Sequence, residues 1–325
     1  MRARILIALF MLVMASVSLA QTFNVSSPTN GSFIGLTNSV SFSATGASAE
    51  NIVRVTATGP GGVQFTNDGT FQPDADGKFS GSLSLNFNQG VPEGDYTIVV
   101  TATQNSVTYS TITINVTLDV TKPKFLQFNP IGGAYVRSGV VPIRVKVLEP
   151  NFKDYRVQVD SQDIPNNTGT TLVDGEFTVN WDTSGIQFDG TKTINVRLRD
   201  EADNEETTVF EVTLDRINPT VIIVQPRADI KLAPRAHVSV AIDVTDGSTN
   251  STDVTGVDVV ARKLDGTFLG RVALRTFTAA SGPTNRWTGR FRWRSGLPKQ
   301  FKLVVHVMDK AGNSAVTQEV IVTYR

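Results

Sequence analysis

The chain has 325 residues, of which 40% are hydrophobic and 18% are charged, and it contains no cysteine. This length is typical of about two or three domains, and the apolar content excludes a chain that is disordered throughout. Basic and acidic residues balance at 30 each, so the zero net charge argues against a protein that coats nucleic acid along its whole length.

The first twenty residues have the layout of a secretory signal peptide. Arg2 and Arg4 precede an uncharged apolar run, and the small residues Ser18 and Ala20 stand where a signal peptidase requires them, before Gln21. The alternative is an uncleaved anchor, but the run is short for a bilayer span of about 20 residues. We expect cleavage after Ala20, an exported protein in the periplasm, at the cell surface or outside the cell, and no transmembrane segment in the mature chain.

From Gln21 onward the apolar stretches are short, rich in β-branched residues and alternating with polar ones. This period of two, bounded by Gly, Pro, Asn and Asp, predicts strands with one buried face. The clearest examples are Val40–Ala44, Tyr96–Ala102, Thr111–Leu118, Ile143–Val147, Ile194–Leu198, Val238–Val244 and Lys302–Val307. We find no convincing amphipathic helix, so the predicted fold class is all-β.

Three markers recur in one order along the chain. A proline closes an early strand at Pro28, Pro130 and Pro226, which are 102 and 96 residues apart. A strand-Asp-x-x-x-Pro linker ends at Pro123 and again at Pro219, and the segments 196–204 (VRLRDEADN) and 305–313 (VHVMDKAGN) resemble each other. Domain-sized spacing of this kind indicates an internal repeat.

Each repeat holds about seven short strands in roughly 100 residues, the size of an immunoglobulin-like β-sandwich. We predict three such domains, at residues 21–120, 121–217 and 218–325. Without thiols they must be held by core packing alone, which suits a bacterial exported protein. Because proline restricts the residue before it to extended conformations, we expect stiff linkers and an elongated rod.

The Asp-x-Ala-Gly-Asn turn before a final strand and the strand-Asp-x-x-x-Pro linker resemble those of tandem bacterial Ig-like domain proteins. The third repeat has the turn intact at Asp309–Asn313, the second has Asp203 in place of the usual glycine, and the first departs from it at 102–105 (ATQN). The resemblance covers essentially all of Gln21–Arg325. It implies adhesion, spacing or ligand binding without choosing among them.

Nothing in the sequence indicates catalysis. The two histidines are His237, at a strand entry, and His306, which alternation places opposite Val305 and Val307 on a surface face. The sequence contains no HExxH motif, phosphate-binding glycine loop or G-x-S-x-G elbow, and its glycine-rich pieces have the composition of turns. We therefore expect a protein that is not an enzyme and requires no cofactor.

Calcium at the domain junctions is the one cofactor that the sequence suggests. In a tandem sandwich the entering linker should approach the turn before the last strand, and the resemblance extends to adhesins and cadherins that bind calcium there. Calcium takes six to eight oxygen ligands. The candidate ligands are Asp119, Asp200, Glu201 and Asp203 at the first junction, and Asp215 and Asp309 at the second. The alternative is that each Asp caps its turn by accepting backbone N–H bonds.

The zero net charge conceals a strong asymmetry. Residues 21–118 carry a net charge of −4, residues 119–215 carry −6, and residues 216–325 carry +8. The third domain is therefore basic, whereas the first two are acidic.

The densest basic piece, residues 286–294 (RWTGRFRWR), predicts a strand with Trp287, Phe291 and Trp293 on the inner face. The outer face would carry a row of arginines about 7 Å apart, suited to phosphate, carboxylate or sulfate groups. The candidate anion-binding residues are Arg290, Arg292 and Arg294, with Arg262, Lys263, Arg271 and Arg275 on nearby strands. The alternative is a solvated face that keeps the sheet edge from pairing. Because the aromatic residues would face inward, we do not expect nucleic acid as the partner.

Together these features predict an exported, non-enzymatic interaction or spacer protein of the bacterial cell envelope, whose basic third domain binds an anionic envelope polymer or an acidic protein. The alternative is a carbohydrate-binding or accessory module that serves a separate enzyme. That function would need exposed aromatic residues, of which Tyr135, Phe152 and Tyr155 form the only loose cluster. The oligomeric state is open.

Overall fold

The computed structural model describes residues 21–227, 230–246, 254–278, 284–292, 294–315 and 318–325. The predicted signal peptide lies outside the described residues and stays a prediction. The described residues form strands throughout, with a single 3-10 turn, η1 (Pro60–Gly62). None of the described helical segments is long and apolar enough to cross a bilayer. The all-β fold class is thus confirmed.

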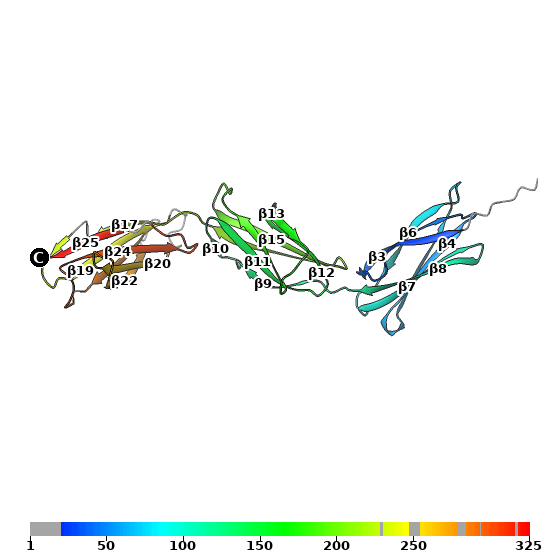
Figure 1. Cartoon of the computed structure of the whole chain (residues 1–325), viewed down its shortest axis with the longest axis horizontal. Coiled ribbons are helices and arrows are strands. Elements are labelled where there is room, and N and C mark those ends of the chain that lie inside the picture. Colours follow the sequence, from blue (N-terminus) through cyan, green and yellow to red (C-terminus); the bar gives the residue numbers. More distant parts are fainter. Residues whose placement is uncertain (1–20, 228–229, 247–253, 279–283, 293, 316–317) are drawn as a thin grey trace, which may run out of the picture. The chain divides into compact units, whose positions relative to one another are not determined.

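The first sandwich pairs a three-stranded sheet with a five-stranded one (Figure 1). The order of the smaller sheet is β1 (Thr22–Ser27), β3 (Thr37–Thr45), β6 (Phe79–Asn86). The order of the larger sheet is β2 (Phe33–Ile34), β8 (Val107–Leu118), β7 (Gly94–Gln104), β4 (Asn51–Thr58), β5 (Gln64–Phe71). Side chains from both sheets, including Val40, Leu85 and Ile98, form one buried core.

The second sandwich has the same arrangement. Its smaller sheet has the order β14 (Glu176–Asp182), β11 (Val140–Leu148), β9 (Lys124–Asn129). Its larger sheet has the order β10 (Tyr135–Val136), β16 (Glu205–Leu214), β15 (Gly190–Asp200), β12 (Phe152–Val159), β13 (Gln162–Gly169). Alternation along β11 buries Val141, Ile143, Val145 and Val147, as the period of two predicts.

The third sandwich adds one strand to the smaller sheet. That sheet has the order β17 (Thr220–Gln225), β19 (Val238–Thr245), β23 (Thr284–Phe291), β22 (Ala273–Thr278). The larger sheet has the order β18 (Ile230–Leu232), β25 (Gln318–Tyr324), β24 (Gln300–Asp309), β20 (Val254–Arg262), β21 (Phe268–Arg271). Its core includes Ile242, Leu303 and Val322. His306 is exposed on β24, as predicted.

The repeated markers occupy equivalent places in the three sandwiches. Strands β1, β9 and β17 each end directly before the repeated prolines, and each proline follows a cis peptide bond. Strands β8, β16 and β25 each receive a short parallel partner, β2, β10 and β18 respectively. The three consecutive immunoglobulin-like sandwiches predicted from the repeat are therefore present.

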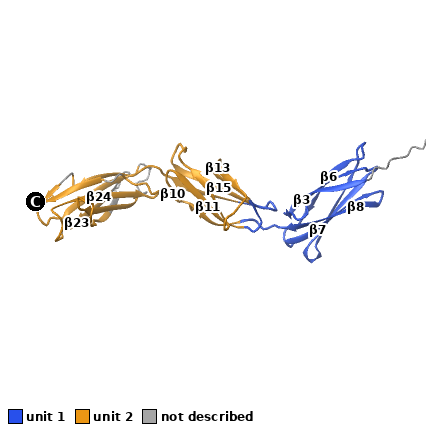
Figure 2. Ribbon diagram, viewed as in Figure 1, with its two compact units in different colours: residues 1–123, 149–153, 199–206 blue, residues 124–148, 154–198, 207–325 orange. Residues whose placement is uncertain are grey.

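The described contacts divide the chain into two compact units (Figure 2). Unit 1 contains the first sandwich, to residue 123, together with residues 149–153 and 199–206. Unit 2 contains residues 124–148, 154–198 and 207–325. The predicted domain boundaries and the rod-like arrangement stay predictions.

Candidate functional site

The turn that follows β15 is closed by the carboxylate of Asp200. The Asp200 Oδ1 atom accepts backbone N–H bonds from Ala202 at 2.9 Å and from Asn204 at 2.8 Å. The backbone N–H of Asp200 donates to the carbonyl of Asn204 at 3.2 Å. The capping role that we named as the alternative to calcium is therefore present in the structure.

The side chain of Asn204 binds this turn to the linker that follows β8, all within unit 1. Its Nδ2 donates to the carbonyl of Asp119 at 2.9 Å and to Asp200 Oδ2 at 2.8 Å. Asp119 Oδ2 in turn accepts a bond from Asn151 Nδ2 at 3.0 Å. The linker Asp and the turn Asp thus approach each other as the sequence predicted.

Three carboxylates meet at this point, which we call the first triad: Asp119, Glu149 and Asp200, with one oxygen of each within 4.8 Å of the others. Burial raises the pKa of Asp200, and the charge of Asp119 raises it further. Burial also raises the pKa of Glu149, with smaller contributions from the charges of Asp200 and Asp119. Ionising all three carboxylates is therefore unfavourable unless a cation compensates the charge.

A hollow of about 290 Å³ borders the first triad, lined among others by Glu93, Asp119 and Glu149. Glu93 Oε1 accepts bonds from the backbone N–H of Val120 and from the hydroxyl of Thr121, both at 2.8 Å. The hollow leaves room for a hydrated cation beside the triad.

Two of the predicted ligands lie outside this group. Asp203, whose φ is +64°, directs its carboxylate to the amine of Lys153 at 2.6 Å and to Arg199 at 3.6 Å. Glu201 is exposed, and its backbone N–H donates to the carbonyl of Asn151. The third member of the triad, Glu149, follows β11 and was not predicted.

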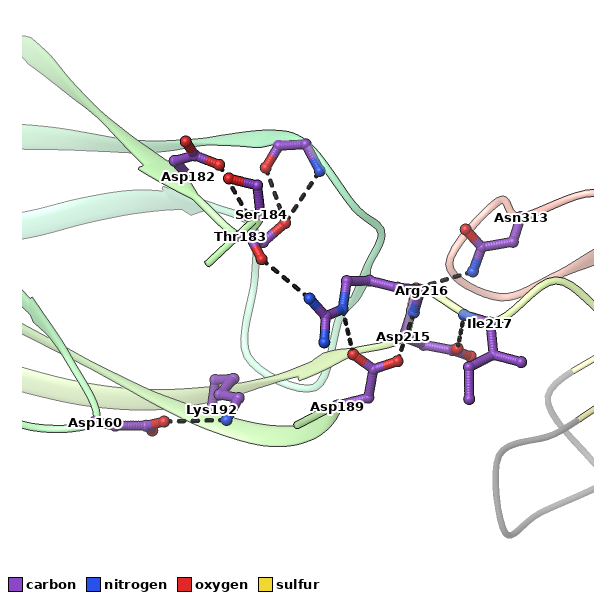
Figure 3. Close-up of polar contacts among 11 residues, drawn as sticks. Asp160, Asp182, Thr183, Ser184, Asp189, Lys192, Asp215, Arg216, Ile217 and Asn313 are labelled. Atoms are coloured by element: carbon purple, nitrogen blue, oxygen red, sulfur yellow. Dashed lines mark hydrogen bonds and ion pairs between the residues drawn. The ribbon is translucent and has the colours of Figure 1, made fainter. Parts of the chain in front are cut away.

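The same contacts recur in unit 2 at the turn after β24. Asp309 Oδ1 accepts the backbone N–H of Asn313 at 2.8 Å. The Asn313 side chain donates to Asp309 Oδ2 at 2.9 Å. It also donates to the carbonyl of Asp215 at 2.9 Å (Figure 3). Asp215 Oδ1 accepts the backbone N–H of Ile217 at 3.1 Å, so the linker Asp also folds its own segment.

The second triad consists of Asp215, Asp246 and Asp309, again with one oxygen of each within 4.8 Å of the others. These three residues are 2%, 1% and 1% exposed, so this site is deeper than the first. Asp246 follows β19 as Glu149 follows β11, and it too was not predicted. An acidic residue directly after the equivalent strand of the second and third sandwiches was the signal available in the sequence.

The donor atoms of both triads are carboxylate oxygens, with the main-chain carbonyl oxygens of Asp119 and Asp215 in the same contacts. Such a set suits a hard cation such as calcium and does not suit zinc, which prefers nitrogen and sulfur. The residues that would hold the ion are the six triad carboxylates. This arrangement could bind a cation and fasten linkers, but it offers no nucleophile beside a base.

The linker that Asn313 contacts at Asp215 is also held at the next residue, Arg216, by Asp189 (Figure 3). Both the backbone N–H and the guanidinium Nε of Arg216 donate to that carboxylate, and Nη1 donates to the carbonyl of Thr183 at 3.2 Å. Glu93 holds the first linker in a similar way through Val120. Each linker is thus anchored by backbone bonds on both of its sides.

The predicted basic row is divided between two places. Arg275, Arg290 and Arg292 line one hollow on the outer face of the smaller sheet of the third sandwich. Arg294 lies beside Gly270 of β21, with its Nη2 3.4 Å from the place where a Cβ of Gly270 would stand. The row does not continue as one strand because β23 ends at Phe291.

The remaining basic candidates belong to the β20–β21 hairpin. Arg262 Nη1 donates to the carbonyl of Gly266 at 2.9 Å, and Arg271 pairs with Asp258 at 3.6 Å. Lys263 is exposed at the turn between these strands. Trp287 and Phe291 pack against the core as predicted, whereas Trp293 lies outside the described residues.

The aromatic residues proposed for carbohydrate binding do not form a platform. Tyr155 is 9% exposed and stacks on Phe177 with ring centroids 3.8 Å apart. The ring of Tyr135 is covered by the amine of Lys310, 5.0 Å from its centroid. Phe152 is half-buried at the start of β12.

Comparison with known proteins does not assign the chain to a family. No family model matches the chain. Bacillopeptidase F of Bacillus subtilis (strain 168) is 28% identical over 170 residues, which are 51% of this chain and 10% of that protein. The chain therefore spans about a tenth of the length of this curated relative.

Several solved structures align with the chain at TM-scores below 0.5. The fibronectin(III)-like modules of Clostridium thermocellum CbhA align with a TM-score of 0.41 and 12% identity, over 62% of this chain and 94% of theirs. A three-domain immunoglobulin segment of titin aligns with 0.38 and 11%, over 94% and 97%. A Ca²⁺-stabilised adhesin of an Antarctic bacterium aligns with 0.34 and 18%, over 95% and 75%.

Proposed function

We propose that the chain is an exported, non-enzymatic interaction and spacer protein of the bacterial cell envelope or surface. The observation that carries this proposal is the repeated contact of a linker Asp, a turn Asn and a turn Asp, seen at Asp119–Asn204–Asp200 and at Asp215–Asn313–Asp309. A chain that fastens each linker to a following turn suits a spacer that carries a binding surface away from its attachment point.

We further propose that calcium occupies both triads. Three carboxylates within 4.8 Å repel one another strongly where they are buried, and a divalent cation offsets that repulsion. The alternative to a bound cation is that one carboxylate of each triad is protonated. The raised pKa of Asp200 and of Glu149 favours protonation when no cation is bound.

The third sandwich is the proposed attachment end, because residues 216–325 carry a net charge of +8. Its partner would be an anionic envelope polymer or an acidic protein. Cells producing the full chain should be fractionated, and the chain then tested for retention on envelope material at low and high salt. We expect the chain in the envelope or medium, with salt-sensitive retention. A chain confined to the cytoplasmic fraction would contradict the proposal.

An accessory module serving a separate enzyme is the second candidate. It is favoured by the similarity of 170 residues to a small part of Bacillopeptidase F, a much longer protein. A carbohydrate-binding version is less favoured because Tyr155 is buried against Phe177. A glycan-array screen separates the two candidates, since selective retention of one glycan would support the accessory module.

A further inference from the structure

The outer face of the sheet β17-β19-β23-β22 contains a hollow of about 640 Å³. Its floor consists of small side chains that the strand register sets side by side: Ser239 and Ala273 lie opposite Arg290, and Ala241 lies opposite Thr288. Arg275, which also lies opposite Thr288, stands diagonally across from Arg290. Small residues surrounded by long cationic ones make a groove on what would otherwise be a flat face.

Three arginines line this groove: Arg275, Arg290 and Arg292. Within the described ranges of the chain, no carboxylate lies within ion-pair distance of any of them. The neighbouring Arg286 shows the contrast, because Asp243 accepts two bonds from its guanidinium, at 2.6 and 2.7 Å. The sheet therefore neutralises the arginine beside the groove and leaves those in the groove available.

The floor offers little to a peptide. Strands β19 and β23 are each paired on both sides, so their main-chain groups are used within the sheet. The small side chains leave no apolar pocket, and the aromatic residues of β23 point into the core. The side chains of this face that the structure describes thus offer neither strand addition nor an apolar side-chain pocket.

We propose that this groove binds the phosphate groups of a linear phosphate-bearing polymer, an inference that rests on the proposed function and specifies its anionic partner. Guanidinium groups donate two parallel bonds to an oxyanion. A carboxylate is planar and meets a guanidinium fork edge to edge, whereas the oxygens of a tetrahedral phosphate lie in different planes and can be met by forks from different sides. Arg275 lies about 7 to 8 Å diagonally from Arg290 across the strand pair, and Arg292 lines the same hollow just after the end of β23. Three forks around one small hollow thus fit phosphate better than carboxylate.

The test measures binding of the full chain to inorganic polyphosphate, to polyglutamate of equal charge and to inorganic phosphate. The groove variant is Arg275→Ser with Arg290→Ser. The matched control, Lys231→Ser with Lys299→Ser, removes the same charge from exposed positions of the third sandwich outside the groove. We expect tight binding of polyphosphate only, a loss of about tenfold or more per groove arginine, and a small loss in the control. A third variant, Ser239→Leu, fills the floor without changing the charge and should also weaken binding.

Equal binding of polyglutamate would overturn the inference in favour of an acidic protein. Equal losses in groove and control variants would overturn it in favour of general charge attraction, and tight binding of free phosphate would exclude a polymer-specific site. If the double arginine variant fails to fold, Ser239→Leu decides the matter. Retention of the chain on envelope material without polyphosphate binding would end this inference and leave the proposed function standing. Loss of both envelope retention and polyphosphate binding would end this inference and the proposed function together.

Discussion

The two triads share one set of contacts but differ in depth. The first, Asp119, Glu149 and Asp200, borders a hollow and includes the longer, partly exposed Glu149. The second consists of three aspartates that are at most 2% exposed. Since water screens repulsion at the first site and not at the second, the second should depend more on a bound cation.

The first sandwich provides a natural contrast at the corresponding turn. Its β7 ends at Gln104, whose amide nitrogen donates to the carbonyl of Ala49 at 2.9 Å. The side chain of Gln21 donates to Gln104 at 3.4 Å. Amides thus stand where the other two sandwiches have carboxylates, so this end should be independent of cations.

The largest expected effect is that of Asp246→Asn. In the wild type, calcium at 100 times its Kd should stabilise the third sandwich by about 2.7 kcal/mol, or about ten degrees or more in Tm. The variant should lose that response, and its metal-free form should be more stable than the wild type because one buried charge is gone. Calorimetry in chelator and in calcium measures both. Asp258→Asn, outside the triad, serves as the control; a full calcium response in Asp246→Asn would exclude the second triad as the site.

Replacing the turn asparagines, Asn313 and Asn204, tests the hydrogen bonds between linker and turn that form without a cation. Asn313→Ala leaves the Asp215 carbonyl and Asp309 Oδ2 without their amide donor in a buried place, at a cost of about 1 to 3 kcal/mol. Asn204→Ala should cost about 0.5 to 1.5 kcal/mol, because water can replace the amide at the more open site. Chemical denaturation in chelator measures both. A larger loss for Asn204→Ala would reverse the proposed order of depth.

The pH dependence of the first triad should be the smallest effect. The raised pKa values of Glu149 and Asp200 mean that the folded chain holds protons that the unfolded chain has released. This stabilisation is complete below the ordinary values of 4.5 and 3.8 and is lost as pH rises through the raised values. In chelator, Glu149→Gln should flatten this part of the stability profile, and Glu201→Gln should not. In calcium the sign reverses, since protons compete with the ion as pH falls.

The sequence was sufficient for the fold because alternation and repeated turns are local signals. The repeat in the sequence predicted that Asp119 lies near Asp200 and that Asp215 lies near Asp309. It did not predict Glu149 and Asp246, because these residues follow strands that are distant in the sequence from both linker and turn. Glu201 and Asp203 were included because they are neighbours of Asp200, although consecutive residues direct their side chains differently. The predicted row of arginines does not extend to Arg294. Side chains alternate between two faces only within a strand, and β23 ends at Phe291.

Calcium titration of the metal-free full chain, followed by thermal unfolding and by direct counting of bound ions, tests the central claim most directly. The two triads predict two bound ions per chain and an unfolding midpoint that rises with calcium. An unfolding midpoint that does not change in millimolar calcium would contradict the account and leave the carboxylates as turn caps alone.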